Sequence, residues 1–306
     1  MWDFAAVRTT VVAGRVLAVG LLCGLDGDTA LRVYDAETGD LLGVLPIDDD
    51  WVYATPERQL SVMDGYATVL TRRSAYVVVR LTSGGPVPIG WHTPPGHVSA
   101  VALGRMGRRA MAFASDGGVV AARPLSGGAS DGPEWTVPAG WRIDGLVRSG
   151  RRTYAWLTDD DRCWLWDVGA ALPVGPPATI RGLRWGPWDL DGRPVLLRLA
   201  WRRYEARDLA LGTPVGPGPP VAAHELSAPC VGAVHGRRVL AAATGQRVRV
   251  WDLLTGRMVH SGQCGEPPLA LAVHDRGLVI VDRQGRARPV PIRPRSVHPL
   301  GAARTS

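Results

Sequence analysis

Short apolar runs, each directly following a tight turn, recur along the whole chain. The residue pairs at these turns are Ala13-Gly14, Asp64-Gly65, Gly107-Arg108, Gly150-Arg151, Asp191-Gly192, Gly236-Arg237 and Asp275-Arg276. Each unit also contains a second run in which apolar and polar residues alternate, most clearly Leu31–Asp35 and Val248–Asp252. Alternation with a period of two predicts half-buried β-strands on both sides of the turns.

The units repeat at an interval typical of propeller blades. The glycines of the seven turns stand 41 to 51 residues apart, and repeats of about 40–45 residues with four strands each indicate blades. We expect a strand on each side of the turn, a third strand, and a short Pro- and Gly-rich fourth strand. The third strands are expected to end near residues 35, 81, 123, 167, 208, 252 and 291. Without helical periodicity, the sequence predicts an all-β fold: one seven-bladed β-propeller domain of four-stranded antiparallel blades over residues 1–306.

Two segments compete for the outer strand of the seventh unit, whose third strand ends at Pro291. They are Ser296–Leu300 and the N-terminal segment Trp2–Val7. Pro294 and Pro299 cannot donate ladder hydrogen bonds, so the N-terminal strand is favoured as the one that closes the ring. Such a closure would cover an exposed sheet edge.

Several aromatic–aspartate pairs resemble those of a known repeat family. They are Trp251-Asp252, Trp166-Asp167 and Tyr34-Asp35, accompanied by the Gly96-His97 pair ahead of the third unit. In these residues the chain resembles the WD-repeat propellers, which tie each blade together by a histidine, serine or threonine, aspartate and tryptophan network. No unit has the complete set, so the resemblance is to a divergent member. It implies a rigid ring that displays loops to protein partners.

Composition narrows the class of protein further. All 35 basic residues are arginine, lysine and asparagine are absent, and the net charge is +7. The two missing residue types have A-rich codons, which indicates a high-GC bacterial genome. Four cysteines without a Cys-x-x-Cys pair do not form a disulfide framework. No apolar run approaches the roughly 20 residues of a membrane-spanning helix, and the N-terminus lacks a secretory pattern, so we expect a cytoplasmic protein without a membrane span.

Arginines gather at the seven turns, which a propeller brings to one face. The candidate contact residues there are Arg108, Arg109, Arg151, Arg152, Arg193, Arg237 and Arg238. Clustered guanidinium groups suit an acidic or anionic partner. The alternative interpretation is that Gly-Arg is an ordinary solvent-exposed turn, and that its arginines reflect the codon usage of a GC-rich genome. The opposite face is expected to be richer in aspartate.

Aromatic residues suggest a second contact patch. Trp91 and His92 are expected in a loop that joins two blades, and Trp185 and Trp188 on an extended turn of the fifth blade. Exposed aromatic side chains are enriched at interface hot spots. These four residues are therefore candidates for an exposed contact with a partner.

Catalytic motifs are absent from the sequence. The seven histidines show no metal-ligand spacing, and no nucleophile elbow or phosphate-binding loop occurs. We therefore expect a non-catalytic protein-interaction platform with an unidentified protein partner and without cofactor or metal. Two alternatives stay open: an enzyme or small-ligand binder using the central funnel of the aspartate-rich face, and an anion or nucleic-acid binder using the arginine turns.

Overall fold

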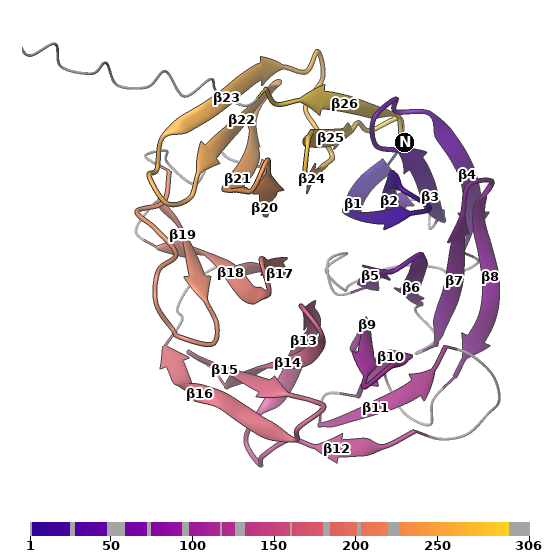
Figure 1. Ribbon diagram of the computed structural model, residues 1–306, viewed down its shortest axis with the longest axis vertical. Coiled ribbons are helices and arrows are strands. Elements are labelled where there is room, and N and C mark those ends of the chain that lie inside the picture. Colours follow the sequence, from indigo (N-terminus) through magenta and orange to yellow (C-terminus); the bar gives the residue numbers. More distant parts are fainter. Residues whose placement is uncertain are drawn as a thin grey trace, which may run out of the picture.

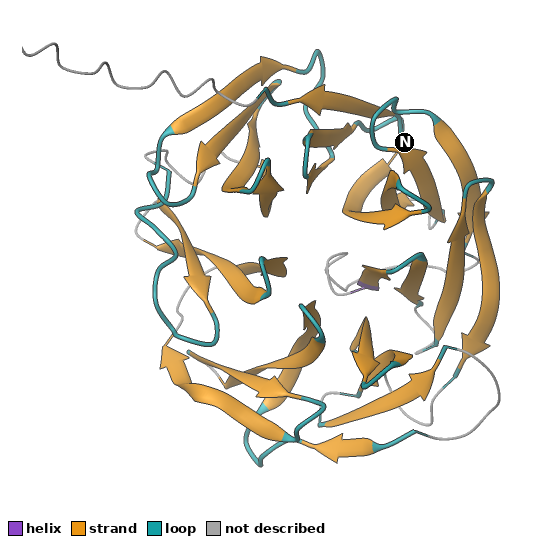
Figure 2. Cartoon of the chain, viewed as in Figure 1, coloured by secondary structure: helices purple, strands orange, loops and turns teal. Residues whose placement is uncertain are grey.

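Seven small antiparallel sheets stand around a central channel like the blades of a propeller (Figure 1). The computed structural model describes residues 2–24, 28–47, 59–71, 75–93, 98–116, 118–125, 132–159, 161–179, 184–200, 203–219 and 227–293. Strands joined by turns and loops make up this part of the chain (Figure 2). The all-β, seven-bladed fold expected from the repeat is confirmed.

Strand boundaries follow the repeat. Blades one to three consist of β1 (Trp2–Val12), β2 (Arg15–Gly24), β3 (Thr29–Asp35), β4 (Leu41–Pro46); β5 (Leu60–Met63), β6 (Tyr66–Leu70), β7 (Tyr76–Thr82), β8 (Gly85–His92); and β9 (Ala100–Met106), β10 (Arg109–Ser115), β11 (Val119–Pro124), β12 (Glu134–Thr136). Blades four and five consist of β13 (Arg142–Ser149), β14 (Arg152–Asp159), β15 (Arg162–Asp167), β16 (Leu172–Thr179); and β17 (Arg184–Leu190), β18 (Arg193–Ala200), β19 (Arg203–Asp208). Blades six and seven consist of β20 (Ser227–Val234), β21 (Arg237–Thr244), β22 (Arg247–Asp252), β23 (Met258–Gln263); and β24 (Ala270–His274), β25 (Gly277–Val281), β26 (Ala287–Pro291).

All seven predicted turns join the first and second strands of their blades, and we call them the opening turns. Both turn residues have positive φ in blades one, two, five and six, as at Asp191 (53°) and Gly192 (78°). In blade six they are His235 and Gly236, one position before the expected Gly236-Arg237 pair. In blades three and four only the first residue does, and it is Gly107 or Gly150, each at 59°. These are the mirror-image turns whose twist suits a hairpin, which explains why glycine marks the period.

Two blades have three described strands instead of the expected four. In blade five the segment after β19 contributes only an isolated bridge between Arg207 and Pro214, with Val215 N donating to Ala206 O at 2.8 Å. Proline cannot donate to a ladder, and Pro214 and Pro217 interrupt this segment. The outer edge of blade five is therefore held by single bonds.

The predicted ring closure by an N-terminal outer strand is wrong. Trp2–Val7 belongs to β1, the innermost strand of blade one, which runs unbroken from Trp2 to Val12 and pairs with β2. Blade seven has β26 as its last described strand, and Ser296–Leu300 lies outside the described residues. The 11 residues of β1 form one continuous strand of blade one. Trp2–Val7 is the first part of that strand and cannot also be the outer strand of blade seven.

The ring closes instead by side-chain packing between blades seven and one. Val7, Ala18 and Leu22 of blade one pack against Val279 and Val281 of blade seven. The Tyr34 hydroxyl donates to Gly285 O at 2.7 Å, and Trp2 N donates to Arg283 O at 3.0 Å. This junction therefore resembles the other six in being apolar.

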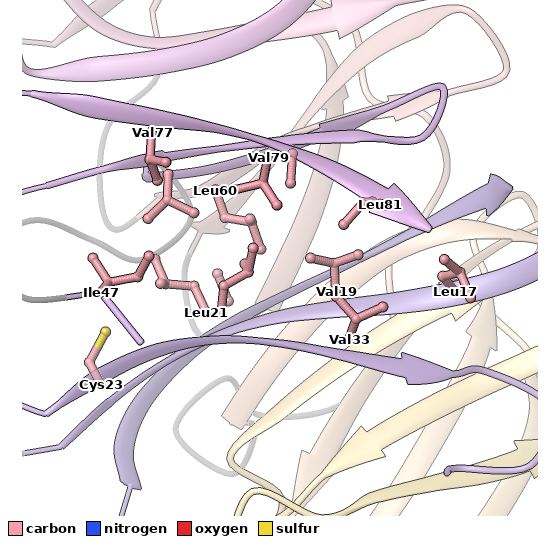
Figure 3. Close-up of a cluster of buried hydrophobic side chains, with 14 residues drawn as sticks. Leu17, Val19, Leu21, Cys23, Val33, Ile47, Leu60, Val77, Val79 and Leu81 are labelled. Carbon is pink, nitrogen blue, oxygen red and sulfur yellow. The ribbon is translucent and has the colours of Figure 1, made fainter. Parts of the chain in front are cut away.

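Each blade is apolar on both faces because it lies between two others. In β2, Leu17, Val19 and Leu21 face blade two, while Ala18 and Leu22 face blade seven. Figure 3 shows the first of these clusters, in which Leu60, Val77 and Val79 of blade two meet Val19 and Leu21. Seven such clusters, one at each junction, form the core.

Gly104 marks the closest approach between blades three and four. A methyl group there would stand 1.7 Å from Thr153 Oγ1 and 2.8 Å from the Phe113 ring. We therefore expect Gly104→Ala to destabilise the protein by about 1–3 kcal/mol, the usual cost of overpacking a core. Urea unfolding measures it. Thr153→Ala in the same chain should restore part of the loss, and Gly118→Ala, where nothing lies within 4 Å, should cost nothing; equal losses at both glycines would contradict this packing.

Candidate interaction surfaces

The opening turns lie side by side on one face of the ring, which we call the turn face. Arg105 Nη2 contacts Asp64 Oδ2 of the preceding blade at 2.9 Å, and Arg238 Nε contacts Asp191 Oδ2 at 2.9 Å. Between blades six and seven, His235 N donates to Asp275 O at 2.6 Å. These contacts place arginines on one face, as the sequence predicts, but with carboxylates among them.

Four blades repeat one ion pair, which we call the Arg–Asp clamp. It joins the arginine that follows the opening turn to the aspartate that ends the third strand. The pairs are Arg15 Nη2–Asp35 Oδ2 at 2.5 Å, Arg152 Nη1–Asp167 Oδ2 at 3.1 Å, Arg193 Nη1–Asp208 Oδ2 at 3.8 Å and Arg237 Nε–Asp252 Oδ2 at 3.5 Å.

Strand register produces the clamp. The residue two positions after the arginine pairs with the aspartate in each case, as Leu17 does with Asp35 and Val239 with Asp252. Residues two apart on a strand share a face, so the arginine is the diagonal neighbour of the aspartate and within reach of it.

The second carboxylate oxygen holds the turn between the third and fourth strands. Asp35 Oδ1 accepts hydrogen bonds from Glu37 N at 2.8 Å and Thr38 N at 3.0 Å. Asp252 Oδ1 accepts from Leu254 N and Thr255 N, both at 2.9 Å. Each clamp aspartate thus ties two turns of its blade together.

The environment of Asp35 favours its ionised form. Burial alone would raise the pKa of this carboxyl, but the hydrogen bonds from Arg15 and from the Glu37 and Thr38 amides outweigh it and lower the pKa below 3.8. A carboxylate that accepts several hydrogen bonds is held charged in this way.

The clamps change the meaning of the predicted basic face. Arg152, Arg193 and Arg237 each pair with a clamp aspartate, and Arg238 pairs with Asp191. The sequence contained a pattern that could have predicted these pairs. In three blades the arginine directly after the turn precedes the aspartate that ends the third strand by 15 residues, as Arg152 precedes Asp167. Neither interpretation of the arginines made from the sequence included this structural role.

Arg108, Arg109 and Arg151 differ from these four. All three are exposed, and none of their side chains makes an ion pair or hydrogen bond with the described part of the chain. Arg109 occupies the clamp position of blade three, but its diagonal neighbour is Pro124. The free arginines therefore lie at two neighbouring opening turns.

The predicted aromatic patch divides into an exposed and a buried part. Trp91 is 54% exposed, but it is the penultimate residue of the outer strand β8 and does not lie in a loop between blades as expected. His92 is half-buried and stacks on Tyr76, with ring centroids 5.0 Å apart. Burial, followed by the Arg123 charge, lowers the pKa of His92 below 6.5.

The expectation of an exposed Trp188 is wrong. This side chain is 7% exposed and packs between blades five and six with Leu190, Leu197 and Trp251. It lies within β17 because a bulge between Trp185 and Trp188 continues the strand through the segment expected to be a turn. The side chain of Trp185 lies outside the described residues.

Exposed apolar side chains concentrate on two neighbouring outer strands. Val87 (48%), Ile89 (42%) and Trp91 (54%) lie on β8, and Leu41 (49%) and Val44 (43%) lie on β4. A bulge in β8 places Val87 opposite Arg80 and Trp91 opposite Val77, so these two side chains leave opposite faces of the strand. The strands touch where Gly43 approaches Gly85 and Pro86, and Figure 1 shows them side by side at the rim. We call these five residues the rim strip.

The central channel offers a third surface. A cavity of about 280 Å³ is lined by innermost strands of six blades, with Arg8, Arg148 and Asp189 among its polar residues. Asp189 accepts hydrogen bonds from Ser149 Oγ at 2.9 Å and Gly150 N at 3.1 Å. Much of the predicted aspartate-rich face, including Asp48–Asp50, lies outside the described residues.

Two other kinds of site are absent from the described ranges. They contain no group of three or more histidine, cysteine, aspartate or glutamate side chains placed to hold a metal ion. They also contain no helix long and apolar enough to cross a membrane.

Comparison with known proteins identifies the class by shape. No protein-family model matches the chain, and no curated protein matches it. A crystal structure of BBS1N in complex with ARL6DN, soaked with mercury, is similar, with 12% identity over 94% of this chain and 92% of that one and a TM-score of 0.64. A lead-soaked crystal of the same complex gives 13% identity, 94% of both chains and a TM-score of 0.62. The protein thus has a seven-bladed propeller fold in common with BBS1N.

The WD-repeat resemblance stays at the level of sequence motifs. Thr244 Oγ1 and Trp166 Nε1 are buried without a hydrogen-bond partner in the described structure. His97 and His224 lie outside the described residues. Four of the blades are instead tied internally by the Arg–Asp clamp.

Substituting a clamp aspartate should lower the free energy of unfolding more than substituting its arginine. We expect Asp35→Ala to destabilise the protein by about 1–3 kcal/mol, because it frees two turn amides and a guanidinium. Arg15→Gln leaves the amide bonds in place, and its exposed ion pair is worth about 1 kcal/mol or less. Chemical unfolding of both variants measures the difference. A larger loss for Arg15→Gln would contradict the assigned order.

His274 should make the protein sensitive to mild acid. It is buried beside the opening turn of blade seven, and its Nδ1 accepts from Arg276 N at 3.4 Å. Burial lowers its pKa below 6.5, with Glu37 and Asp275 only partly offsetting the effect. The unfolded chain then binds the proton more readily than the folded one, so stability falls as pH drops below about 6.5.

Urea midpoints at about pH 7.5 and about pH 5 measure this loss. His274→Gln should unfold with a smaller decrease between the two conditions than the parent protein. An unchanged decrease would show that His274 does not carry the sensitivity.

Proposed function

We propose that this protein is a protein-interaction platform whose rim strip docks a partner. The observation that carries the proposal is the set of three large exposed apolar side chains, Val87, Ile89 and Trp91, on one outer strand. A solvent-facing strand normally alternates apolar-in with polar-out. The outer strand of blade six exposes Ser261 and Gln263 and a single large apolar side chain, Met258.

The occupant that fits the rim strip is a folded protein with apolar side chains on its surface. Contiguous exposed apolar residues mark interaction sites, and tryptophan is enriched among hot spots. Addition of a partner strand to the β8 edge is disfavoured, because Pro86 and Pro88 have no N–H to donate. Side-chain packing against Trp91 is therefore the expected contact.

The rigid ring beneath the rim strip supports the same proposal. Tyr76, Val77 and Val79 behind β8 are buried in the junction clusters, so the strip is held on a fixed surface. The similar BBS1N structures contain a protein, ARL6DN, in complex with the propeller. A propeller of this shape can thus present a surface to a protein.

Affinity capture from the native cells, followed by quantitative mass spectrometry, tests the proposal. A partner captured by the parent protein should be lost from Ile89→Ser/Trp91→Ser by at least about tenfold, the effect of removing hot-spot contacts. Leu211→Ser is the matched control, because Leu211 is 64% exposed on blade five. Equal capture by the parent protein and the strip variant would overturn docking through the rim strip.

A further inference from the structure

Blade three departs from the Arg–Asp clamp in one residue. Arg109 follows the opening turn as Arg15, Arg152, Arg193 and Arg237 do in their blades. Met111, two positions on, pairs with Pro124, which stands where the four clamped blades have aspartate. The arginine of the clamp is therefore present in blade three, and its carboxylate is not.

Two further arginines lie on the opening turns of blades three and four. Arg108 is the second residue of the same opening turn, and Arg151 is the second residue of the next one. Both are exposed and, like Arg109, have no ion pair with the described residues. By contrast Arg152, adjacent to Arg151, is held by Asp167 at 3.1 Å. We call Arg108, Arg109 and Arg151 the blade-three corner.

We propose that the blade-three corner binds carboxylates of an acidic polypeptide. An aspartate or glutamate of the partner takes the place beside Arg109 that Asp35, Asp167, Asp208 and Asp252 take in their own blades. Those four pairs show that an arginine at this point of a blade reaches a carboxylate at 2.5 to 3.8 Å. Arg108 and Arg151 then hold neighbouring acidic side chains.

The surroundings favour a polypeptide over a nucleic acid. Binding of single-stranded nucleic acid relies on aromatic side chains between the basic residues, and the opening turns of blades three and four contain none. The carboxylate is also the group that this scaffold already holds in four blades. The proposal rests on the proposed function only in needing a protein partner, and it involves residues apart from the rim strip.

Fluorescence anisotropy of a labelled oligoglutamate peptide tests the corner directly. The parent protein should bind it, and the affinity should fall as NaCl rises from about 50 to about 200 mM, as for any contact made through several charges. Arg108→Gln/Arg109→Gln/Arg151→Gln should weaken binding at least about tenfold, since each arginine loses charge-assisted hydrogen bonds.

A matched variant separates the corner from net charge. Arg15→Gln/Arg193→Gln/Arg237→Gln removes the same charge from clamped arginines and should change affinity by no more than about threefold, because distant charges are screened. Absence of peptide binding at low salt, or equal losses in the two triple variants, would overturn the proposal. Tighter binding of a labelled single-stranded DNA than of the peptide would also overturn it and favour nucleic acid.

Pro124→Asp tests whether the missing clamp aspartate leaves Arg109 available to a partner. The new aspartate should complete the clamp with Arg109, occupy its guanidinium, and weaken peptide binding as much as Arg109→Gln does. Pro124→Ala, which supplies no carboxylate, should bind like the parent protein. Undiminished peptide binding by a folded Pro124→Asp protein would contradict the assigned role of Arg109. Because none of these variants changes the rim strip, failure here leaves docking at the rim strip to be judged separately.

Discussion

The structure depends on each blade burying both of its faces against two neighbours. A four-stranded sheet that is apolar on both sides is stable only between others, so the ring has to close. Closure is achieved by the packing of Val7 and Leu22 on Val279 and Val281, and no strand is shared between the ends. Because the core lies between blades, the turns and the outer strands are free to vary in sequence without loss of the fold.

Ion pairs hold the turns, which lie outside the apolar core. Each clamp aspartate connects the opening turn of its blade to the turn between the third and fourth strands. Both turns on the turn face are therefore held in place. Three of the seven predicted binding arginines belong to clamps, and a fourth, Arg238, pairs with Asp191. Arg109 lacks such a partner. Among the blades with an arginine at the clamp position, only blade three has a proline, Pro124, in place of the aspartate.

The sequence predicted the ring, the seven opening turns and the third-strand ends, because each rests on a local period of two and on turn glycines. It failed where two placements satisfied the same pattern, as for Trp2–Val7. Trp188 was misplaced because a bulge let β17 continue past Gly186 and Pro187. The rim strip was half visible in the sequence: Trp91 stood out, but that β4 and β8 lie side by side depends on the contact between two blades.

These surfaces make one account, in which a rigid ring presents apolar side chains at its rim and unpaired arginines on its turn face. Hydrogen exchange of the protein with and without a captured partner tests this account most directly. Slowed exchange confined to β4 and β8, with or without the opening turns of blades three and four, is the predicted result. Protection of the innermost strands around Arg8 and Cys230, with β4 and β8 unchanged, would place the ligand in the channel and contradict the account.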